Sequence, residues 1–323
     1  MDAATAIAII VFAGIFAQWL AWRLRLPSIL LLLIFGFAVG PLTGWVDSGA
    51  VFGELLFPIV SLFVCVILFE GGLSLKFSEL KDVGKVVRNL ATIGVAVTWA
   101  GSAAAAYWFL ELPFSQALLF GGILTVTGPT VIGPMLRHVR PNGRVGSILK
   151  WEGIVNDPIG ALLSVLVFEA IVIESSSTSL LVFVGTIKTL GFGIGFGLLG
   201  AGLLYLLLER HSVPDFLHSP VALALAVAAF GASNSLQHES GLFAVTIMGI
   251  ALANQKRVDV SHIVEFKENL GVLMISLLFV MLASRLQVDS LRFVSPKTLC
   301  FLGILIFLIR PACIFLSTIG SSL

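Results

Sequence analysis

Charged side chains are scarce in this chain: Asp, Glu, Lys and Arg together make up 11% of its 323 residues. Soluble globular domains carry about 25%. Hydrophobic residues make up 58%, and the mean hydropathy is +1.06. This balance excludes a soluble enzyme or a soluble binding module. It indicates a protein that crosses a lipid membrane several times.

The chain also lacks the usual marks of nucleic-acid binding, signal cleavage and metal binding. The net charge is +1 and no basic run is dense, so no nucleic-acid partner is expected. The N-terminal letters MDAAT include no basic residue, so the first apolar segment is not expected to be a cleaved signal. The three cysteines, Cys65, Cys300 and Cys313, lack metal-ligand spacing and are expected to be packing residues. No cofactor, disulfide or enzymatic activity is expected.

Apolar runs long enough to cross a bilayer follow one another along the whole chain. A membrane-spanning helix needs about 20 apolar residues. We therefore predict an all-α polytopic membrane protein with eleven transmembrane helices. Their expected bounds are 3–22, 27–43, 52–72, 87–109, 114–136, 147–171, 179–208, 218–236, 240–254, 264–284 and 298–318.

The basic residues indicate how these helices are oriented. If the N-terminus lies outside, fourteen of the 19 Lys and Arg fall in inside loops and three in outside loops. The other two, Lys188 and Arg310, lie within apolar segments. Because Lys and Arg concentrate in cytoplasmic loops, the count predicts that the N-terminus lies outside. The expected location is the cell (inner) membrane, with membrane lipid around the helices.

The two halves of the chain show a weak internal similarity. The letters LFEGGLSLKF from Leu68 and LFVMLASRLQV from Leu278 both run from an apolar segment through small residues to a charge. The two copies lie an odd number of spans apart, as in an inverted-topology repeat. We expect a first repeat at 1–174, a linker helix at 175–212 and an incomplete second repeat at 213–323.

The apolar segment 114–136 is interrupted by the letters TVTGPT. Pro129 has no N–H, so the carbonyl of Thr125 loses its helical partner, and Gly128 permits unusual backbone angles. Carbonyl and hydroxyl oxygens at a broken membrane helix suit an alkali cation. The alternative is an ordinary proline kink whose carbonyls are bonded by threonine. The residues of this unwound stretch are Thr125, Thr127, Gly128, Pro129 and Thr130.

Three polar residues, Glu152, Asn156 and Asp157, lie in the next expected helix, 147–171. Glu152 and Asn156 are four residues apart and share a face. Asp157 points roughly 140° away from Glu152, so it can face a cavity while the other two face a neighbouring helix. Burial disfavours the charged form of a carboxylate, so such a group can hold either a proton or a cation. A carboxylate inside a membrane segment is a functional candidate by default.

Two further charged residues lie at membrane depth. Arg310 is in the middle of the last apolar segment, where a lone arginine costs ~2.5 kcal/mol or more and therefore needs an anionic partner. Glu152 is the expected partner, with Asn156 as a source of an extra hydrogen bond. Glu70, at the inner end of 52–72, is either a third carboxylate of the site or an interfacial residue. His138 is interpreted as a solvated loop histidine.

Four motifs now carry a family resemblance: FEGGL at Phe69–Leu73, TxTGPT at Thr125–Thr130, WEGIVNDP at Trp151–Pro158 and IRP at Ile309–Pro311. With these motifs in this order, the chain resembles the sodium/proton exchanger (NhaP-type) branch of the monovalent cation/proton antiporters. The resemblance implies thirteen helices in two inverted repeats, a crossing at a discontinuous helix five, and a homodimer.

The resemblance also implies a function and a site. The protein would exchange Na⁺ or K⁺ for H⁺ by alternating access, and the Asn156-Asp157 pair implies electroneutral exchange. Asp157 would bind the cation or the proton in turn, Thr127 would be a cation ligand, and Glu70 would reach the ion through water. The stabilising network that it implies consists of Glu152, Asn156 and Arg310.

Three departures from the family pattern leave alternatives open. Gly128 replaces an Asp of many relatives and Gly153 a Ser of some, so the choice between Na⁺ and K⁺ stays open. Helices twelve and thirteen are expected to be missing, and a longer form is expected to carry a cytosolic regulatory domain. The alternatives are a potassium efflux channel-like system and a non-transporting truncated membrane subunit. An intramembrane aspartyl protease needs two facing aspartates, whereas Asp157 alone lies well inside an apolar segment.

Overall fold

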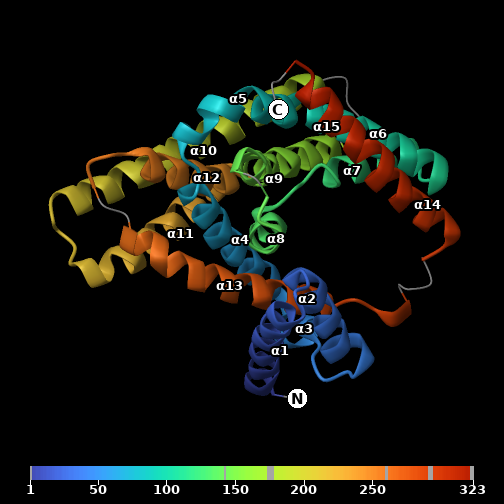
Figure 1. Cartoon of the computed structure of the whole chain (residues 1–323), viewed down its shortest axis with the longest axis horizontal. Coiled ribbons are helices and arrows are strands. Elements are labelled where there is room, and N and C mark those ends of the chain that lie inside the picture. The colour runs from blue at the N-terminus through green and yellow to red at the C-terminus, as the bar shows by residue number, and fades with distance from the viewer. Residues whose placement is uncertain (1, 142, 173–177, 259–260, 290–293, 321–323) are drawn as a thin grey trace.

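The computed structural model describes residues 2–141, 143–172, 178–258, 261–289 and 294–320 (Figure 1). All regular secondary structure in these residues is helical, and none of them lies in a β-strand. The first part comprises α1 (Ala3–Leu24), α2 (Ser28–Phe37), π-helical η1 (Ala38–Leu42), α3 (Ser48–Phe52), η2 (Gly53–Leu55), α4 (Leu56–Leu73), η3 (Phe77–Glu79), α5 (Leu80–Asn89), π-helical η4 (Leu90–Gly94) and α6 (Val95–Phe109). The middle part comprises α7 (Phe114–Ile123), α8 (Pro129–Val139), α9 (Gly143–Val172) and α10 (Thr178–Glu209). The last part comprises η5 (Asp215–Leu217), α11 (His218–Leu236), α12 (Ser240–Asn254), α13 (Ser261–Ala283), α14 (Pro296–Ile304), π-helical η7 (Leu305–Ile309) and α15 (Arg310–Thr318).

The helices have the length and surface of membrane spans. Among the described residues, seven helical runs are long and apolar enough to cross a bilayer, and four shorter apolar helices accompany them. Large hydrophobic side chains point outward, among them Phe12, Trp22 and Phe307, which are 72%, 76% and 81% exposed. Such a surface is unfavourable in water and favourable in hydrocarbon. The protein is therefore a multi-pass, all-helical membrane protein.

Glycines allow two pairs of helices to pack at very short distance. A β-carbon at Gly36 of α2 would lie 2.6 Å from Ala283 Cβ of α13. A β-carbon at Gly72 of α4 would lie 2.6 Å from the Thr246 carbonyl oxygen of α12. Small residues at membrane helix interfaces permit this kind of backbone approach. Helix α2 thus packs on α13, and α12 packs on α4.

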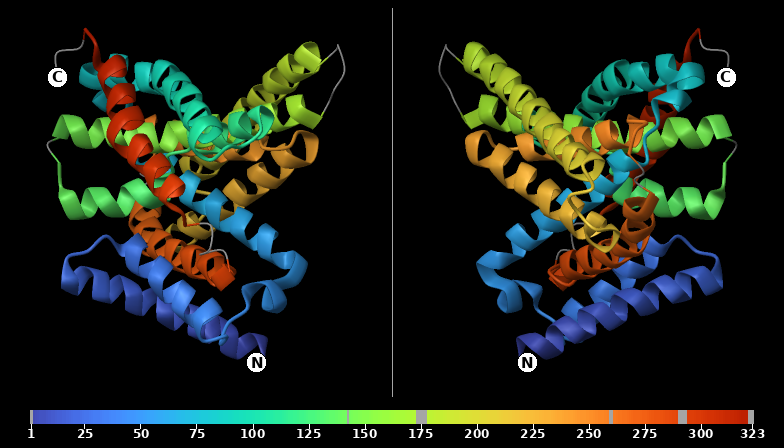
Figure 2. Two further views of the ribbon diagram at one scale, coloured as in Figure 1. Left: turned by 90° about the vertical axis from the view of Figure 1, so that its right-hand side faces the viewer. Right: turned by 90° about the vertical axis from the view of Figure 1, so that its left-hand side faces the viewer.

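Helix α9 lies at the centre of the helices that form the candidate site. It packs against α5, α7, α8 and α10. Figure 2 shows α8 and α9 side by side, with the N-terminal helices at the opposite end of the molecule from the C-terminal end of the chain. Buried side chains of α5 and α9, including Val83, Val86, Trp151 and Ile154, form one hydrophobic cluster. This cluster fixes the first half of α9, in which the polar residues lie.

Two expectations about local structure need correction. Helix α8 continues to Val139, beyond the expected end at 136, so His138 is helical and not a loop residue. The helical run expected to begin at 87 begins at Phe77, because η3, α5, η4 and α6 follow one another without a break. The helix expected at 179–208 is confirmed as α10, which contains the exposed Lys188. Hydropathy locates the apolar part of a helix and misses the polar turns that extend it.

Candidate cation and proton site

The structure contains a wide break between α7 and α8. Helix α7 ends at Ile123 and α8 begins at Pro129, and residues 124–128 are not helical. Gly128 precedes α8 in an extended conformation, with φ −78° and ψ 151°. Pro129 is then the first helical residue, where its missing N–H leaves no helical hydrogen bond unmade. The proline therefore starts a second half-helix here, and the discontinuity is larger than a proline kink.

Several oxygen atoms in this break are available to a ligand. No backbone N–H of the described residues bonds the carbonyl oxygens of Thr125, Val126 or Thr127. The Thr125 hydroxyl donates to the Gly122 carbonyl at 2.7 Å, whereas the buried Thr127 Oγ1 has no hydrogen-bond partner. Buried polar atoms without partners are rare in folded proteins. The arrangement is an oxygen-rich environment of the kind that suits an alkali cation.

One face of α9 is built to meet the break. Gly153, Asp157 and Gly160 follow one another at i, i+4 and i+7, so they lie on the same side of the helix. A β-carbon at Gly160 would lie 2.7 Å from Val126 Cγ2, and one at Gly153 would lie 2.8 Å from Ile132 Cδ1 of α8. The two glycines therefore bring α9 close to both sides of the break, with Asp157 between them. Sequence reasoning missed Gly160, although its spacing from Asp157 was visible.

The Asp157 carboxylate lies against the start of α8. A β-carbon at Gly128 would be 3.4 Å from Asp157 Oδ1 and 3.2 Å from Thr130 Oγ1. The N-terminal end of a helix favours a negative charge, and the C-terminal end favours a cation. The start of α8 therefore stabilises the carboxylate, while the carbonyl end of α7 favours an ion beside it. Asp157 is partly buried, not fully enclosed by protein.

The opposite side of α9 holds a salt bridge. Arg310 Nη2 donates to Glu152 Oε1 at 2.5 Å, and the two side chains are 33% and 2% exposed. This pairing is the one expected from the cost of a lone arginine. Arg310 is the first residue of α15, and that helix is attached to η4 by a hydrogen bond from Cys313 Sγ to the Gly94 carbonyl at 3.4 Å. Each charge of the pair is compensated by the other.

Asn156 does not make the hydrogen bond that was expected of it. Its side chain is 3% exposed and its Oδ1 atom has no hydrogen-bond partner. Among the described residues, no hydrogen bond joins Asn156 to Glu152 or Arg310. The amide oxygen is therefore a second unpartnered polar atom, in the residue directly before Asp157.

Glu70 lies in a neighbouring cavity. The cavity measures about 320 Å³, and Glu70, Pro129, Ile132 and Lys150 are among its lining residues. Lys150 donates to Glu79 Oε1 at 2.8 Å and to the Ser74 carbonyl at 3.0 Å, so its charge is already paired. The cavity reaches Pro129, the residue after Gly128, and its lining does not include Asp157. The structure thus places Glu70 near the break and does not place it against Asp157.

Comparison with known proteins identifies the family. Residues 7–322 match the family model for the sodium/hydrogen exchanger, transmembrane. The Na⁺/H⁺ antiporter 1 of Methanocaldococcus jannaschii is 31% identical over 317 residues, which cover 94% of this chain and 72% of that protein. The K⁺/H⁺ antiporter NhaP of Alkalimonas amylolytica is 28% identical over 320 residues, which cover 97% of this chain and 54% of that protein. This chain therefore spans only part of the length of these relatives.

A solved structure of an antiporter is also similar to this chain. The sodium proton antiporter MjNhaP1 from Methanocaldococcus jannaschii, determined at pH 8, matches with a TM-score of 0.82 and 28% identity. The match covers 100% of this chain and 80% of that chain. The family is one of transporters, not of enzymes. From the family match over nearly the whole chain, this protein belongs to the sodium/hydrogen exchanger family.

Proposed function

We propose that this protein exchanges Na⁺ or K⁺ for H⁺ across the membrane, with Asp157 binding the cation and the proton in turn. The observation that carries the proposal is the position of the Asp157 carboxylate against a helix break that contains the unpartnered Thr127 hydroxyl. Family membership and the names of the relatives support the class of reaction. They leave the choice between Na⁺ and K⁺ open, because relatives of both names match.

The arrangement suggests how one site serves two ions. The cation would take oxygen ligands from Asp157, from Thr127 Oγ1 and from the free carbonyls of the break. A proton on Asp157 cancels the charge that holds the cation, so each ion displaces the other. Because Asn156 is neutral, Asp157 is the one group of the Asn156-Asp157 pair that changes charge. This supports exchange of one cation for one proton.

The neighbouring groups receive supporting roles in this proposal. Glu152 and Arg310 form a compensated pair that holds α9 against α15. The unpartnered Asn156 amide is a polar group that a water molecule or a small movement can satisfy. Glu70 raises the local concentration of cations in the cavity that reaches Pro129, and it acts on the ion through water.

Reciprocal packing supports the inverted repeat of 1–174 and 213–323 around the linker helix. In the expected symmetry, α2 corresponds to α12 and α4 corresponds to α13. The contact of α2 with α13 then has a counterpart in the contact of α12 with α4, and a glycine allows close approach in both. The homodimer, the cell (inner) membrane location and the outside N-terminus are also part of the proposal, on the grounds of family membership and the distribution of basic residues.

The proposal is tested by substituting Asp157 in the chain reconstituted into liposomes. Asp157→Asn is expected to abolish proton movement driven by a Na⁺ or K⁺ gradient. Glu169→Gln is the matched control, because Glu169 is another carboxylate of α9, twelve residues further along the helix. Exchange at the normal rate by Asp157→Asn would overturn the assignment of Asp157. Potassium flux without proton counterflow would favour a channel, and no flux by the unmodified chain would favour a non-transporting subunit.

A further inference from the structure

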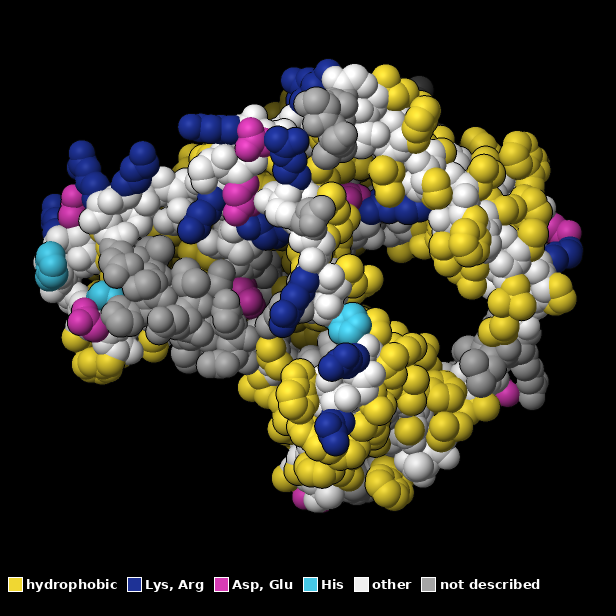
Figure 3. Space-filling view, viewed as in Figure 1, with side chains coloured by type: hydrophobic (Ala, Val, Ile, Leu, Met, Phe, Trp, Pro, Cys, Tyr) yellow, Lys and Arg dark blue, Asp and Glu magenta, His cyan; other side chains and the backbone are white. Residues whose placement is uncertain are grey.

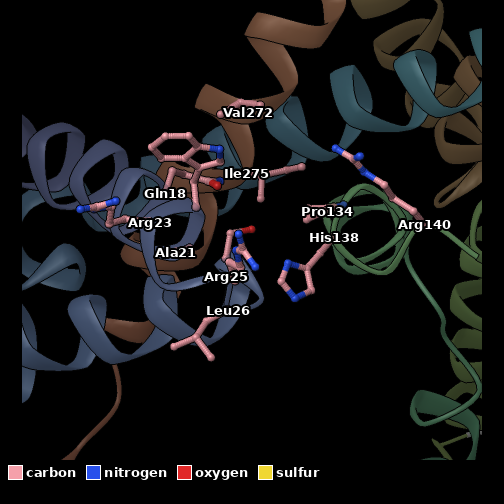
Figure 4. A pocket seen from close by; sticks show the side chains of 12 residues that line it. Gln18, Ala21, Arg23, Arg25, Leu26, Pro134, His138, Arg140, Val272 and Ile275 are labelled. Carbon is pink, nitrogen blue, oxygen red and sulfur yellow. The ribbon is translucent and has the colours of Figure 1, made fainter.

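A second and larger cavity lies between the end of α1 and α8 (Figure 4). Its volume is about 630 Å³, and its described lining contains neither Asp157 nor Glu70. It meets the Glu70 cavity at Pro134 and Ile275, which line both.

The polar lining of this cavity is basic. Arg23, Arg25, His138 and Arg140 all line it, and no Asp or Glu is among its described lining residues. Figure 3 shows a histidine side chain next to Lys or Arg side chains near the middle of this face of the molecule. A cation pathway lined in this way would repel its own cargo. The charges are instead suited to an anion.

Two of these arginines occupy an uncommon backbone conformation. Arg25 ends α1 with φ 55° and Arg140 ends α8 with φ 48°, both in the left-handed region. Glycine is the usual residue at such a helix end, because it takes this conformation without strain. The negative end of each helix favours a nearby cation, which accounts for a positive charge at these positions. Because α1 and α8 both end at the border of this cavity, arginines from two different helices line it.

Arg25, His138 and Arg140 have no side-chain partner among the residues that the structure describes. Figure 4 shows Arg25, from the α1 side, and His138, from α8, directed toward each other across the cavity. Neither they nor Arg140 form a side-chain hydrogen bond or an ion pair with any described residue. Opposed donors of this kind can both donate to one anion that lies between them. An imidazole N–H donates in either protonation state, so His138 serves this purpose whether or not it is charged.

We propose that this cavity binds a phosphate group through Arg25, His138 and Arg140. A planar guanidinium matches the oxygens of phosphate, and an arginine from each of two helices suits a tetrahedral anion between them. Trp22 and Leu26 supply an apolar wall beside the basic groups. Such a cavity fits the headgroup of an acidic phospholipid, and the phosphate of a small soluble anion has the same chemistry. The bound group connects the turn after α1 to α8, the half-helix that begins at the Asp157 site.

The test uses the purified full chain in detergent and measures binding, not transport. The probes are inorganic phosphate and phosphatidylglycerol in mixed micelles, with phosphatidylcholine as the lipid control, and the readout is the unfolding temperature as a function of probe concentration. Charge-assisted hydrogen bonds are strong enough that Arg25→Gln/His138→Gln is expected to weaken binding by about tenfold or more. Lys81→Gln, an exposed inside lysine away from the cavity, is the matched control and should bind normally.

The outcomes separate the sources of phosphate. If the double variant loses binding of phosphatidylglycerol alone, the ligand is a lipid; if it also loses binding of inorganic phosphate, a soluble anion is a ligand too. The proposal is overturned if neither probe binds, if Lys81→Gln weakens binding equally, or if phosphatidylcholine stabilises the chain as much as phosphatidylglycerol. If the double variant does not fold, Arg140→Gln on α8 tests the same contacts, and unchanged binding by it overturns the proposal.

Discussion

The two glycines that flank Asp157 on α9 differ in what a methyl group would meet. At Gly160 a β-carbon would lie 2.7 Å from Val126 Cγ2 and 3.0 Å from the Val126 backbone nitrogen. At Gly153 the three nearest atoms all belong to the side chain of Ile132, with its Cδ1 nearest at 2.8 Å. A side chain can rotate away, whereas a backbone atom in the break cannot move without shifting the site. The structure therefore predicts that Gly160→Ala is the more damaging of two equal changes.

The expected magnitude follows from this geometry. Extra methyl groups in packed interiors cost ~1–3 kcal/mol. Alanine gains about 1 kcal/mol over glycine in a helix, and that gain is the same at Gly153 and Gly160. The comparison of the two variants removes the common gain, and we expect Gly160→Ala to be less stable than Gly153→Ala by roughly 1–2 kcal/mol. A displaced α9 also moves Asp157 from the break, so Gly160→Ala should need a higher cation concentration for half-maximal exchange.

The assay is equilibrium unfolding in detergent micelles combined with cation-driven proton flux in liposomes. The rescue variant Gly160→Ala/Val126→Ala removes the methyl group closest to the new β-carbon and should recover part of the lost stability. Equal stability and equal cation dependence of Gly153→Ala and Gly160→Ala would refute the assignment of Gly160 to the close approach. A more damaging Gly153→Ala would place the critical contact at α8 and not at the break.

Three further predictions concern charged and polar groups. Glu152→Gln leaves Arg310 without a partner and should lower the free energy of unfolding by about 3 kcal/mol, the lower end for a broken buried pair because Arg310 is partly exposed. In a double-mutant cycle, Glu152→Gln/Arg310→Gln should recover most of this stability. No recovery would contradict the pairing. Thr127→Val removes a hydroxyl without a partner, so unfolding should show no loss of stability while cation-driven exchange weakens; an equal loss of both would assign Thr127 a structural role. Lys297 beside the exposed Glu111 holds the pKa of that carboxyl below its ordinary value. The pair therefore stabilises the fold when the pH is above the ordinary pKa of a glutamate, and this stabilisation is lost as the pH falls through the lowered pKa. The unfolding curves of the wild type and of Glu111→Gln should converge in acid. A difference in stability that persists in acid contradicts the pairing.

Much of the helical layout follows from the lengths of the apolar runs. The segments expected at 218–236 and 240–254 coincide with α11 and α12. The sequence does not predict the π-helical turns η1, η4 and η7. Hydropathy carries no information about whether a backbone N–H bonds the carbonyl four or five residues earlier. Both η4 and η7 lie at contacts between segments far apart in the chain, because α15 packs on η4 and α6 packs on η7.

The sequence predicts those parts of the candidate site in which an unpaired charge would be unfavourable inside the membrane. A lone Arg310 in an apolar segment demands an anion, and the Glu152 pairing followed from that cost. The neutral Asn156 amide, unlike Arg310, does not need a partner of opposite charge. Its hydrogen bonds therefore depend on a side-chain rotamer that the sequence does not specify. The role of Gly160 could not be predicted for a similar reason. It depends on which segment packs against this glycine, here the break at Thr125 and Val126, and the sequence does not specify that contact.

Under the proposed function, the two sides of α9 would explain why a single carboxylate changes its charge. Glu152 is held by Arg310 and lies 2% exposed, so a proton arriving at the site finds that charge already compensated. Asp157 projects from another side, beside two glycines that bring it to the free oxygens of the break. A charge compensated by protein is fixed, and a charge compensated by a mobile ion is exchangeable. If a second carboxylate joined the exchange, the stoichiometry would have to change, so a measured ratio of one cation to one proton is the outcome that this division of α9 requires.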